Sequence, residues 1–369
     1  MTLIEEHESY KEETRLAVGE VLLKKHDQRR DSLDRPYFRR EVQVGDISDA
    51  SEEKKLWYRS EGEKGEAWLR ANPQVKKTIV RRKTREVIID PNNRAACDLY
   101  YDSAGNPTSM VEWAKDFPDA IALYALQHPD TDGGRMLESG TIDHATREKF
   151  TYMLDAIGIR TRAAIYAEIL VDLAVSTDED RLNIISVGSG AAVPNIGATR
   201  RVEQELGKSI DWIFFDNDPR AIGFAHTLIN EQGFERSRVD YGPTTIHEDG
   251  TSTFEGRSYH EAYAQPDESA NVVDALGLFE YLRDETAIDF VKNLYAKVKP
   301  GGVMIISNML KNRPQEEFNK RGVGWPHLFL RSEDDLLTVL SLAGVDTNDV
   351  TMTHAVDGVY VVVEIRKPE

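Results

Sequence analysis

The chain has 369 residues, a length typical of two domains or of one large domain with an extension. Its 64 acidic residues outnumber its 46 basic residues, and the net charge of −18 argues against a general nucleic-acid binder. Cys97 is the single cysteine of the sequence, which excludes an internal disulfide and a multi-cysteine metal site. With neither a signal-peptide pattern nor a long apolar run, we expect a cytoplasmic protein that makes no membrane contact.

Residues 1–140 are expected to form an accessory region that is mostly helical, with short β segments. Residues 8–30 are predicted to be helical, with a narrow apolar face formed by Leu16, Leu22 and Leu23. Residues 78–80 and 87–90 predict short strands around a basic run that is best interpreted as solvated charge. Residues 99–107 favour a hairpin, and residues 109–127 favour helix. This region is expected to serve as a lid, a substrate-recognition domain or a homodimer interface.

The remaining residues, 141–369, are predicted to form a second domain. Residues 143–175 predict a helix in which Ile165, Ile169 and Leu173 form an apolar stripe. Strands are then expected to alternate with helices, an order that indicates a mainly parallel sheet. The expected strands are 182–187, 212–215, 271–276, 303–306 and 359–365, and the later helices are expected over 284–298 and 333–342.

Candidate ligand-binding residues follow the first two of these strands. Gly188, Ser189 and Gly190 come directly after residues 182–187 and open a helix, whose N-terminus favours a polar or anionic group. Asp216 ends the second strand, 26 residues after Gly190, where a carboxylate can accept hydrogen bonds from ribose hydroxyls. Asp218 is expected only to cap the next helix.

The glycine pattern favours one adenosine over a dinucleotide. A dinucleotide fingerprint requires Gly or Ala where Val193 stands, and its acidic residue follows after about 20 residues rather than 26. A cofactor that contains no pyrophosphate needs only the two glycines and the acidic residue.

Residues 184–365 resemble the class I S-adenosylmethionine-dependent methyltransferases. The matching segments are 186–190 as the glycine loop, 214–219 as the ribose segment, 271–274 as the fourth strand and the Lys-Pro-Gly-Gly turn at 299–302. The resemblance implies an α/β fold with a Rossmann-like, mainly parallel sheet and a C-terminal antiparallel hairpin, here formed by 350–356 and 359–365 around Asp357 and Gly358. The sequence departs from the family at Ser186, where an acidic residue is usual, and at Ala192, where a third glycine is frequent.

The resemblance also implies roles for individual residues. S-adenosyl-L-methionine would be bound by Gly188, Ser189, Gly190, Asp216, Asn217 and Asp274, with Asp240, Glu248 or Asp249 contacting the adenine. Catalytic candidates are Glu280, Tyr281 and His327, and candidate substrate contacts are Asn308 and Trp325. Arg160 and Arg162 are weaker candidates for the cofactor carboxylate. The histidines show no metal-ligand spacing, so we expect no metal site.

The sequence therefore predicts a methyltransferase that transfers a methyl group to nitrogen or oxygen of a small molecule. The acidic charge favours a neutral or cationic acceptor such as an amine, a guanidine or an amino acid. Two alternatives stay open at this point. One is an NAD(P)-dependent oxidoreductase on a similar sheet, and the other is a non-catalytic protein that binds an adenosyl ligand.

Overall fold

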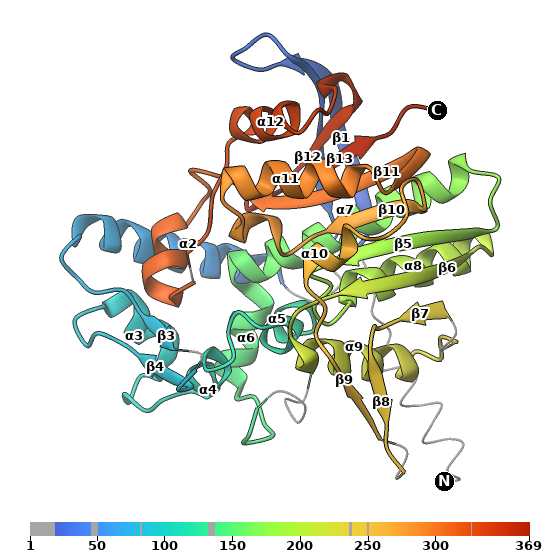
Figure 1. Ribbon diagram of the computed structural model, residues 1–369. Helices are drawn as coiled ribbons and strands as arrows, with labels where there is room; N and C mark the ends of the chain where they lie inside the picture. Colours follow the sequence, from blue (N-terminus) through green and yellow to red (C-terminus); the bar gives the residue numbers. More distant parts are fainter. Residues whose placement is uncertain are drawn as a thin grey trace.

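A computed structural model describes residues 19–45, 51–81, 83–131, 137–235, 238–248, 251–325 and 327–369. Within these residues, nine strands form one sheet in the order β1-β2-β12-β13-β11-β10-β5-β6-β7, with helices on both faces (Figure 1). The strands of the sheet are β1 Val21–Arg30, β2 Pro36–Val44, β5 Arg181–Val187, β6 Ser209–Phe215, β7 Val239–Asp240, β10 Ala270–Ala275, β11 Val298–Met309, β12 Val350–Ala355 and β13 Tyr360–Arg366.

The centre of the sheet is parallel, and its C-terminal part is an antiparallel hairpin. Strands β11, β10, β5, β6 and β7 pair in parallel, whereas β13 runs antiparallel to both β11 and β12. The turn of the hairpin is formed by Asp357, whose Oδ1 accepts a 2.9 Å hydrogen bond from the amide of Val359, and by Gly358 at φ 71°. The predicted Rossmann-like sheet and its C-terminal hairpin are confirmed.

Two apolar cores lie on the two faces of this sheet, because successive side chains of a strand point to opposite sides. Ile184 of β5 belongs to the core that includes residues of α7, α8 and α9, and Ile185 belongs to the core that includes residues of α11 and α12.

Val298, predicted to end a helix, is instead the first residue of β11, and the helix before it ends at Tyr295. The elements of this part are α7 Leu154–Ser176, α8 Val193–Leu206, α9 Pro219–Glu231, β8 Thr244–Ile246, β9 Ser252–Phe254, α10 Tyr259–Ala262, η2 Phe279–Tyr281, α11 Asp284–Tyr295, η3 Phe318–Val323, α12 Glu333–Leu342 and η4 Thr347–Asp349.

The N-terminal segment extends the sheet instead of forming a helix. Residues 21–30 form β1, which pairs with β2, and β2 pairs in parallel with β12. The helical prediction for 8–30 is therefore wrong over 21–30, and residues 8–18 lie outside the described chain. The physical reason is the pairing partner: β2 pairs antiparallel with β1 from Val21 to Arg30, with one irregularity between Leu23 and Lys25, and charged side chains suit an edge strand such as β1.

The elements between β2 and α7 form a lobe beside the sheet (Figure 1). Residues 99–107 do not form the expected hairpin, because Tyr100 ends a helix and only Tyr101 and Pro107 pair across the turn that follows. The expected short strands are present. Each of the two regions expected to be helical, 109–127 and 143–175, holds two helices with a break between them, the second break being at Met153 in extended conformation. The elements of the lobe are α2 Glu52–Ala71, β3 Ile79–Arg81, β4 Glu86–Ile88, α3 Arg94–Tyr100, α4 Ser109–Ala114, α5 Ala120–Gln127 and α6 His144–Tyr152.

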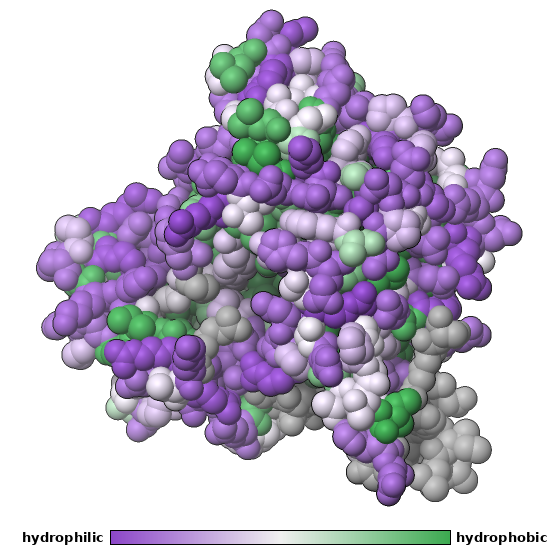
Figure 2. Space-filling model, viewed as in Figure 1, coloured by the Kyte–Doolittle hydropathy of each residue, from purple (hydrophilic) through white to green (hydrophobic). Residues whose placement is uncertain are grey.

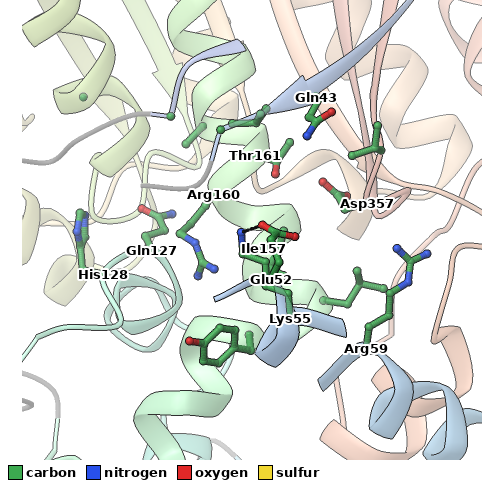
Figure 3. A pocket seen from close by; sticks show the side chains of 18 of the residues that line it. Gln43, Glu52, Lys55, Arg59, Gln127, His128, Ile157, Arg160, Thr161 and Asp357 are labelled. Atoms are coloured by element: carbon green, nitrogen blue, oxygen red, sulfur yellow. Dashed lines mark hydrogen bonds and ion pairs between the residues drawn. The ribbon is translucent and has the colours of Figure 1, made fainter. Parts of the chain in front are cut away.

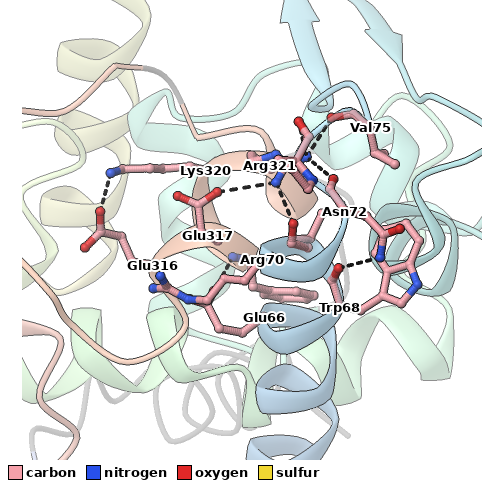
Figure 4. Close-up of polar contacts among 12 residues, drawn as sticks. Glu66, Trp68, Arg70, Asn72, Val75, Glu316, Glu317, Lys320 and Arg321 are labelled. Atoms are coloured by element: carbon pink, nitrogen blue, oxygen red, sulfur yellow. Dashed lines mark hydrogen bonds and ion pairs between the residues drawn. The ribbon is translucent and has the colours of Figure 1, made fainter.

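Arg321 connects this lobe to the C-terminal half of the chain. From η3, its guanidinium donates hydrogen bonds to the backbone carbonyls of Leu69, Asn72 and Val75 at the end of α2 (Figure 4). These bonds add side-chain donors to the carbonyl groups at the C-terminus of α2 and in the turn that follows it. The lobe is thus fixed against the segment that follows β11.

The face of the molecule seen in Figure 2 is mostly hydrophilic, with small scattered hydrophobic patches. Among the helices that the structure describes, none combines the length and the apolar character needed to cross a membrane.

Candidate functional site

A cavity of about 480 Å³ opens at the carboxyl ends of β5, β6 and β10. Parallel strands present their carboxyl ends at one edge of a sheet, where ligands of this architecture bind. The first turn of α8 forms one wall, and Pro118, Ala120, Leu123 and Gln127 contribute from α5 and the residues just before it. The sequence-predicted residues that line the cavity are Arg162, Gly188, Ser189, Gly190, Asp216, Asn217, Asp274 and Tyr281.

The glycine turn brings backbone close to this cavity. Gly188 and Gly190 have φ values of 65° and 55°, a backbone conformation that residues with a side chain rarely adopt. A Cβ atom on Gly188 would lie 2.8 Å from Cβ of Leu278, which also lines the cavity. Ala192 precedes α8 without a side-chain cap, so the electropositive N-terminus of this 14-residue helix adjoins the cavity.

The carboxylate of Asp216 stabilises the glycine turn at 188–190 through a hydrogen bond. Its Oδ2 accepts a 2.9 Å hydrogen bond from the amide of Gly190, and its Oδ1 accepts one of 2.9 Å from the amide of Asp218. Asp218 caps α9 as expected, because its carboxylate accepts a hydrogen bond from the amide of Arg220. The carboxylate of Asp216 therefore lines the cavity in an orientation set by the backbone.

Asp274 lies opposite Ser186 on the neighbouring strand, and its carboxylate is surrounded by donors. Ser186 donates to Oδ1 at 2.7 Å, while Tyr166 and Asn195 donate to Oδ2 at 2.8 and 3.0 Å. Burial raises the pKa of Asp274 to about 6, and the three hydrogen bonds oppose that rise. Position 186, where the sequence has serine and not an acidic residue, thus contributes a donor to the carboxylate of the adjacent strand.

Sequence reasoning missed Tyr166 and Asn195. Tyr166 lies four residues after Arg162 on α7, so the two side chains share one face of the helix. That spacing is the signal that could have identified Tyr166. Asn195 carries no such signal, because its role depends on how the first turn of α8 meets β10.

The opposite wall contains Tyr281, whose hydroxyl accepts a 3.0 Å hydrogen bond from Nε1 of Trp325. Trp325 itself is buried and packs edge-on against Phe117, so it orients Tyr281 and does not line the cavity. Glu280 is also buried outside the cavity lining, with Oε1 3.9 Å from Arg162. Burial raises the pKa of Glu280 to about 7, and the charges of Arg162 and Arg331 oppose the rise.

Two other candidates from the sequence lie away from the cavity. Asn308 is fully buried, where its amide donates to the carbonyl of Phe329 and its oxygen accepts from Arg331. His327 is exposed, and its ring packs against Phe329. The structure therefore gives Asn308 the role of holding the segment after η3, and it places no ligand-lining group at His327.

The candidates for the adenine-contacting acid are also outside the lining. Asp240 pairs with Arg257, at 3.1 Å between Oδ2 and Nη1, and Glu248 is exposed. Asp249 lies outside the described residues. Arg257, which the sequence did not single out, does line the cavity, with its guanidinium 4.1 Å from the ring centre of Phe215.

A second cavity, of about 540 Å³, lies between α2 and α7 (Figure 3). Gln127 and Val193 line both cavities. Arg160 lines only the second cavity, and its guanidinium donates to the backbone carbonyls of Leu126, Phe150 and Thr151. In the described parts of the chain, no group of three or more His, Cys, Asp or Glu residues could hold a metal ion.

No model of a protein family matches the chain, and no curated protein matches it. A possible exported protein from Bordetella parapertussis is 13% identical with a TM-score of 0.54, over 88% of this chain and 100% of that chain. Magnesium protoporphyrin IX methyltransferase from Synechocystis PCC 6803, with bound SAH, is 16% identical with a TM-score of 0.41, over 58% of this chain and 87% of that chain. The N-methyltransferase NodS from Bradyrhizobium japonicum is 15% identical with a TM-score of 0.35, over 56% of this chain and 97% of that chain.

The strand order and directions decide the fold. Residues 181–366 form a parallel sheet with α8 between β5 and β6, α11 between β10 and β11, and an antiparallel hairpin of β12 and β13 at its end. The chain therefore has the fold of the class I S-adenosylmethionine-dependent methyltransferases.

Proposed function

We propose that this protein is an S-adenosyl-L-methionine-dependent methyltransferase that acts on nitrogen or oxygen of a small molecule. The observation that carries the proposal is one cavity that combines the glycine turn at 188–190, the uncapped N-terminus of α8 and the carboxylate of Asp216. These groups suit an adenosine with a polar tail.

The residues at the start of α8 favour a single nucleoside over a dinucleotide. Val193 lines the cavity at the position where a dinucleotide-binding fold has Gly or Ala. A branched side chain there opposes the close packing of helix on strand that the third small residue of a dinucleotide-binding fold allows. This residue supports S-adenosylmethionine over NAD(P).

S-adenosylmethionine, when bound, supplies an electrophilic methyl group on a sulfonium sulfur. The chain then has to align the acceptor with that methyl group and exclude water, and positioning alone contributes several kcal/mol. Asp216 would accept hydrogen bonds from the ribose hydroxyls. Tyr281, oriented by Trp325, and Arg162 line the cavity and would contact the acceptor or the amino-acid end of the cofactor.

Glu280 would assist indirectly. It does not line the cavity, but its carboxylate lies beside Arg162, which does. Its charge would therefore orient Arg162 and influence any proton leaving the acceptor through the local potential. We assign it a positioning role.

Calorimetric titration tests the cofactor. S-adenosylmethionine and S-adenosylhomocysteine are expected to bind with micromolar affinity, whereas NADH and NADPH are expected not to bind. Binding of a nicotinamide cofactor alone would overturn the proposal. Asp216→Ala is the matched control, because it removes one carboxylate of the cavity and leaves the glycine turn in the sequence.

Transfer itself is tested with methyl-labelled S-adenosylmethionine. The label is expected to move to a member of a panel of amines, guanidines, amino acids and hydroxy compounds, since the acidic chain favours neutral or cationic acceptors. Tight binding of the cofactor without transfer to any member of a broad panel would favour a non-catalytic binding protein.

A further inference from the structure

The second cavity, between α2 and α7, shares part of its wall with the cavity at the strand ends. Gln127 and Val193 line both cavities. Val193 is the first residue of α8, and the uncapped N-terminus of that helix is where the proposed function places the polar tail of the cofactor. One end of the second cavity therefore lies next to the expected position of the methionine part of the cofactor.

Part of the wall of the second cavity is apolar and exposed to solvent. Leu56 of α2 is 66% exposed, and Val356, in the turn between β12 and β13, is 55% exposed. Tyr152 and Leu154 also line this cavity and are buried. Covering exposed apolar side chains is favourable in proportion to the area removed from water, so this wall favours a ligand with an apolar body.

Two polar atoms of lining residues have no hydrogen-bond partner in the described chain. They are Oε1 of Gln127, whose residue is buried, and Nε2 of His128, which follows it at the end of α5 (Figure 3). A buried polar atom without a partner is unfavourable. The amide oxygen of Gln127 can only accept a hydrogen bond, so the group that would pair with it is an N–H or O–H donor.

The charge beside these atoms disfavours a cationic ligand. Arg160 lines the same cavity, and its guanidinium is fixed there by three backbone carbonyls. Burial and the charge of Arg160 lower the pKa of His128 to about 4, so this imidazole is neutral near pH 7. An ammonium or guanidinium group at this wall would meet the same repulsion from Arg160, whereas a neutral donor would not.

Both acidic residues in the described lining of the cavity already have a partner. Glu52 pairs with Lys55 at 2.8 Å, and Asp357 accepts a hydrogen bond from the amide of Val359. Burial also raises the pKa of Asp357, which favours its neutral form. These carboxyl groups therefore do not offset the repulsion that Arg160 exerts on a cation.

We propose that the second cavity binds the methyl acceptor and that the acceptor is a neutral compound with an apolar body and an N–H or O–H group, an inference that rests on the proposed function. Phenols, anilines and indoles have this chemistry. Aliphatic amines, guanidines and free amino acids are charged near pH 7 and do not. The donor group pairs with Gln127 at the end next to the cofactor, and the apolar body packs against Leu56 and Val356.

Transfer to such an acceptor is balanced without a further reactant. A bond forms between the acceptor nitrogen or oxygen and the methyl carbon as the bond between sulfur and that carbon breaks. The sulfur keeps the electron pair of the broken bond, and the proton of the acceptor leaves to water. The chain contributes position and the exclusion of water from the reacting atoms.

The first arm of the test measures binding of small probes to protein saturated with S-adenosylhomocysteine. The probes p-cresol and indole are compared with 4-methylanisole and benzofuran, which have similar shapes and no donor. Each donor is expected to bind about threefold or more tightly than its counterpart in ligand-observed NMR titrations. Tyramine and tryptamine, which add an ammonium group to the same rings, are expected to bind more weakly than p-cresol and indole.

Variants of the lining residues locate these probes. Gln127→Leu is expected to abolish the preference for a donor, and Gln127→Glu retains an acceptor oxygen and is expected to keep it. Leu56→Asp is expected to weaken p-cresol and indole. Trp57→Asp is the matched control with unchanged binding, because Trp57 is the next residue of α2, is 56% exposed and does not line the cavity.

The second arm tests transfer with methyl-labelled S-adenosylmethionine and a panel that includes phenols, anilines and indoles. The label is expected to reach these neutral compounds. Ala163→Phe fills the cavity from α7 and is expected to lower transfer by about tenfold or more, with the affinity for S-adenosylhomocysteine unchanged. Leu56→Asp, at an exposed position, replaces Ala163→Phe if that variant does not fold.

The two proposals fail in different ways. If the protein binds S-adenosylhomocysteine but neither p-cresol nor indole, or if Leu56→Asp and Trp57→Asp weaken the probes equally, the inference is overturned and the proposed function stands. Transfer confined to amines, guanidines or amino acids, or probe binding in the cavity without transfer to any neutral compound, would also overturn it. Failure to bind S-adenosylhomocysteine would overturn the proposed function itself.

Discussion

Tyr166 donates a 2.8 Å hydrogen bond to Oδ2 of Asp274, although 108 residues separate the two in the sequence. The bond joins the middle of α7 to the carboxyl end of β10. It is one of three that hold a buried carboxylate beside the glycine turn, so this polar cluster couples the helix before the parallel sheet to the floor of the cavity.

Tyr166→Phe is expected to destabilise the protein by roughly 1.5–3 kcal/mol at pH 8, where Asp274 is ionised, because the lost hydrogen bond reaches a charged group. Urea unfolding measures the change. Tyr100→Phe is the matched control: this buried hydroxyl donates to the carbonyl of Val323 at 2.7 Å, a neutral acceptor, and its loss is expected to cost about 1 kcal/mol. Equal losses in the two variants would contradict the charged character of the Asp274 cluster.

Asp216→Ala is expected to weaken S-adenosylhomocysteine by about tenfold or more, because a hydrogen bond to a carboxylate contributes about 1.5–3 kcal/mol. Stability should also fall, since Asp216 accepts hydrogen bonds from the amides of Gly190 and Asp218. Asp216→Asn retains one side-chain acceptor, so its affinity for S-adenosylhomocysteine in calorimetry should lie between those of the unaltered protein and Asp216→Ala. Unchanged affinity in a folded Asp216→Ala protein would exclude a ribose contact.

Glu280→Gln is expected to change how stability depends on pH. The pKa of Glu280 is raised to about 7 in the folded protein, above the ordinary value of about 4.3 for an unfolded chain. Between these values the folded state holds a proton that the unfolded state has released, so the contribution of Glu280 to stability falls as pH rises.

Glutamine cannot titrate, so the variant should gain stability relative to the unaltered protein from pH 5 to about pH 7 and level off above that. Urea unfolding at several pH values gives both curves, and an additional Asp274→Asn variant separates the contribution of the carboxyl whose pKa is about 6. Parallel curves for Glu280→Gln and the unaltered protein would show that Glu280 titrates normally.

Gly188→Ala is expected to destabilise the glycine turn for two separable reasons. The φ of 65° costs a side-chain-bearing residue roughly 1–2 kcal/mol. In addition, the new Cβ would meet Cβ of Leu278 at 2.8 Å. Leu278→Gly, which removes the Cβ of Leu278, is expected to relieve this contact. Only the conformational cost of the positive φ at position 188 then remains. Leu278→Ala would keep the Cβ and therefore the contact.

A double-mutant cycle in urea measures this coupling. Strict additivity of Gly188→Ala and Leu278→Gly would mean that the turn moves away from Leu278 without a penalty. Both single variants are expected to remain folded, because Gly188 belongs to neither core and the half-buried Leu278 only packs against the edge of one.

The sequence by itself determined the alternation of strands and helices from residue 181 onward and the position of the glycine turn and Asp216. Periodicity and turn residues are local signals, and in a parallel sheet the carboxyl ends of strands must meet at one edge. The residues Gly188, Gly190, Asp216 and Tyr281 therefore reach one cavity as the order of strands predicts.

Only the tertiary structure decided which polar side chains face that cavity. Glu280 and Tyr281 are adjacent in sequence, yet Tyr281 lines the cavity and Glu280 is buried behind Arg162, because a single turn of η2 directs neighbours to different sides. The tertiary structure also decided the secondary structure of β1. Its charged sequence favours a helix in isolation, but it becomes a strand because β2 offers it a backbone partner. Pairing between distant segments and burial of charge depend on contacts that no local pattern contains.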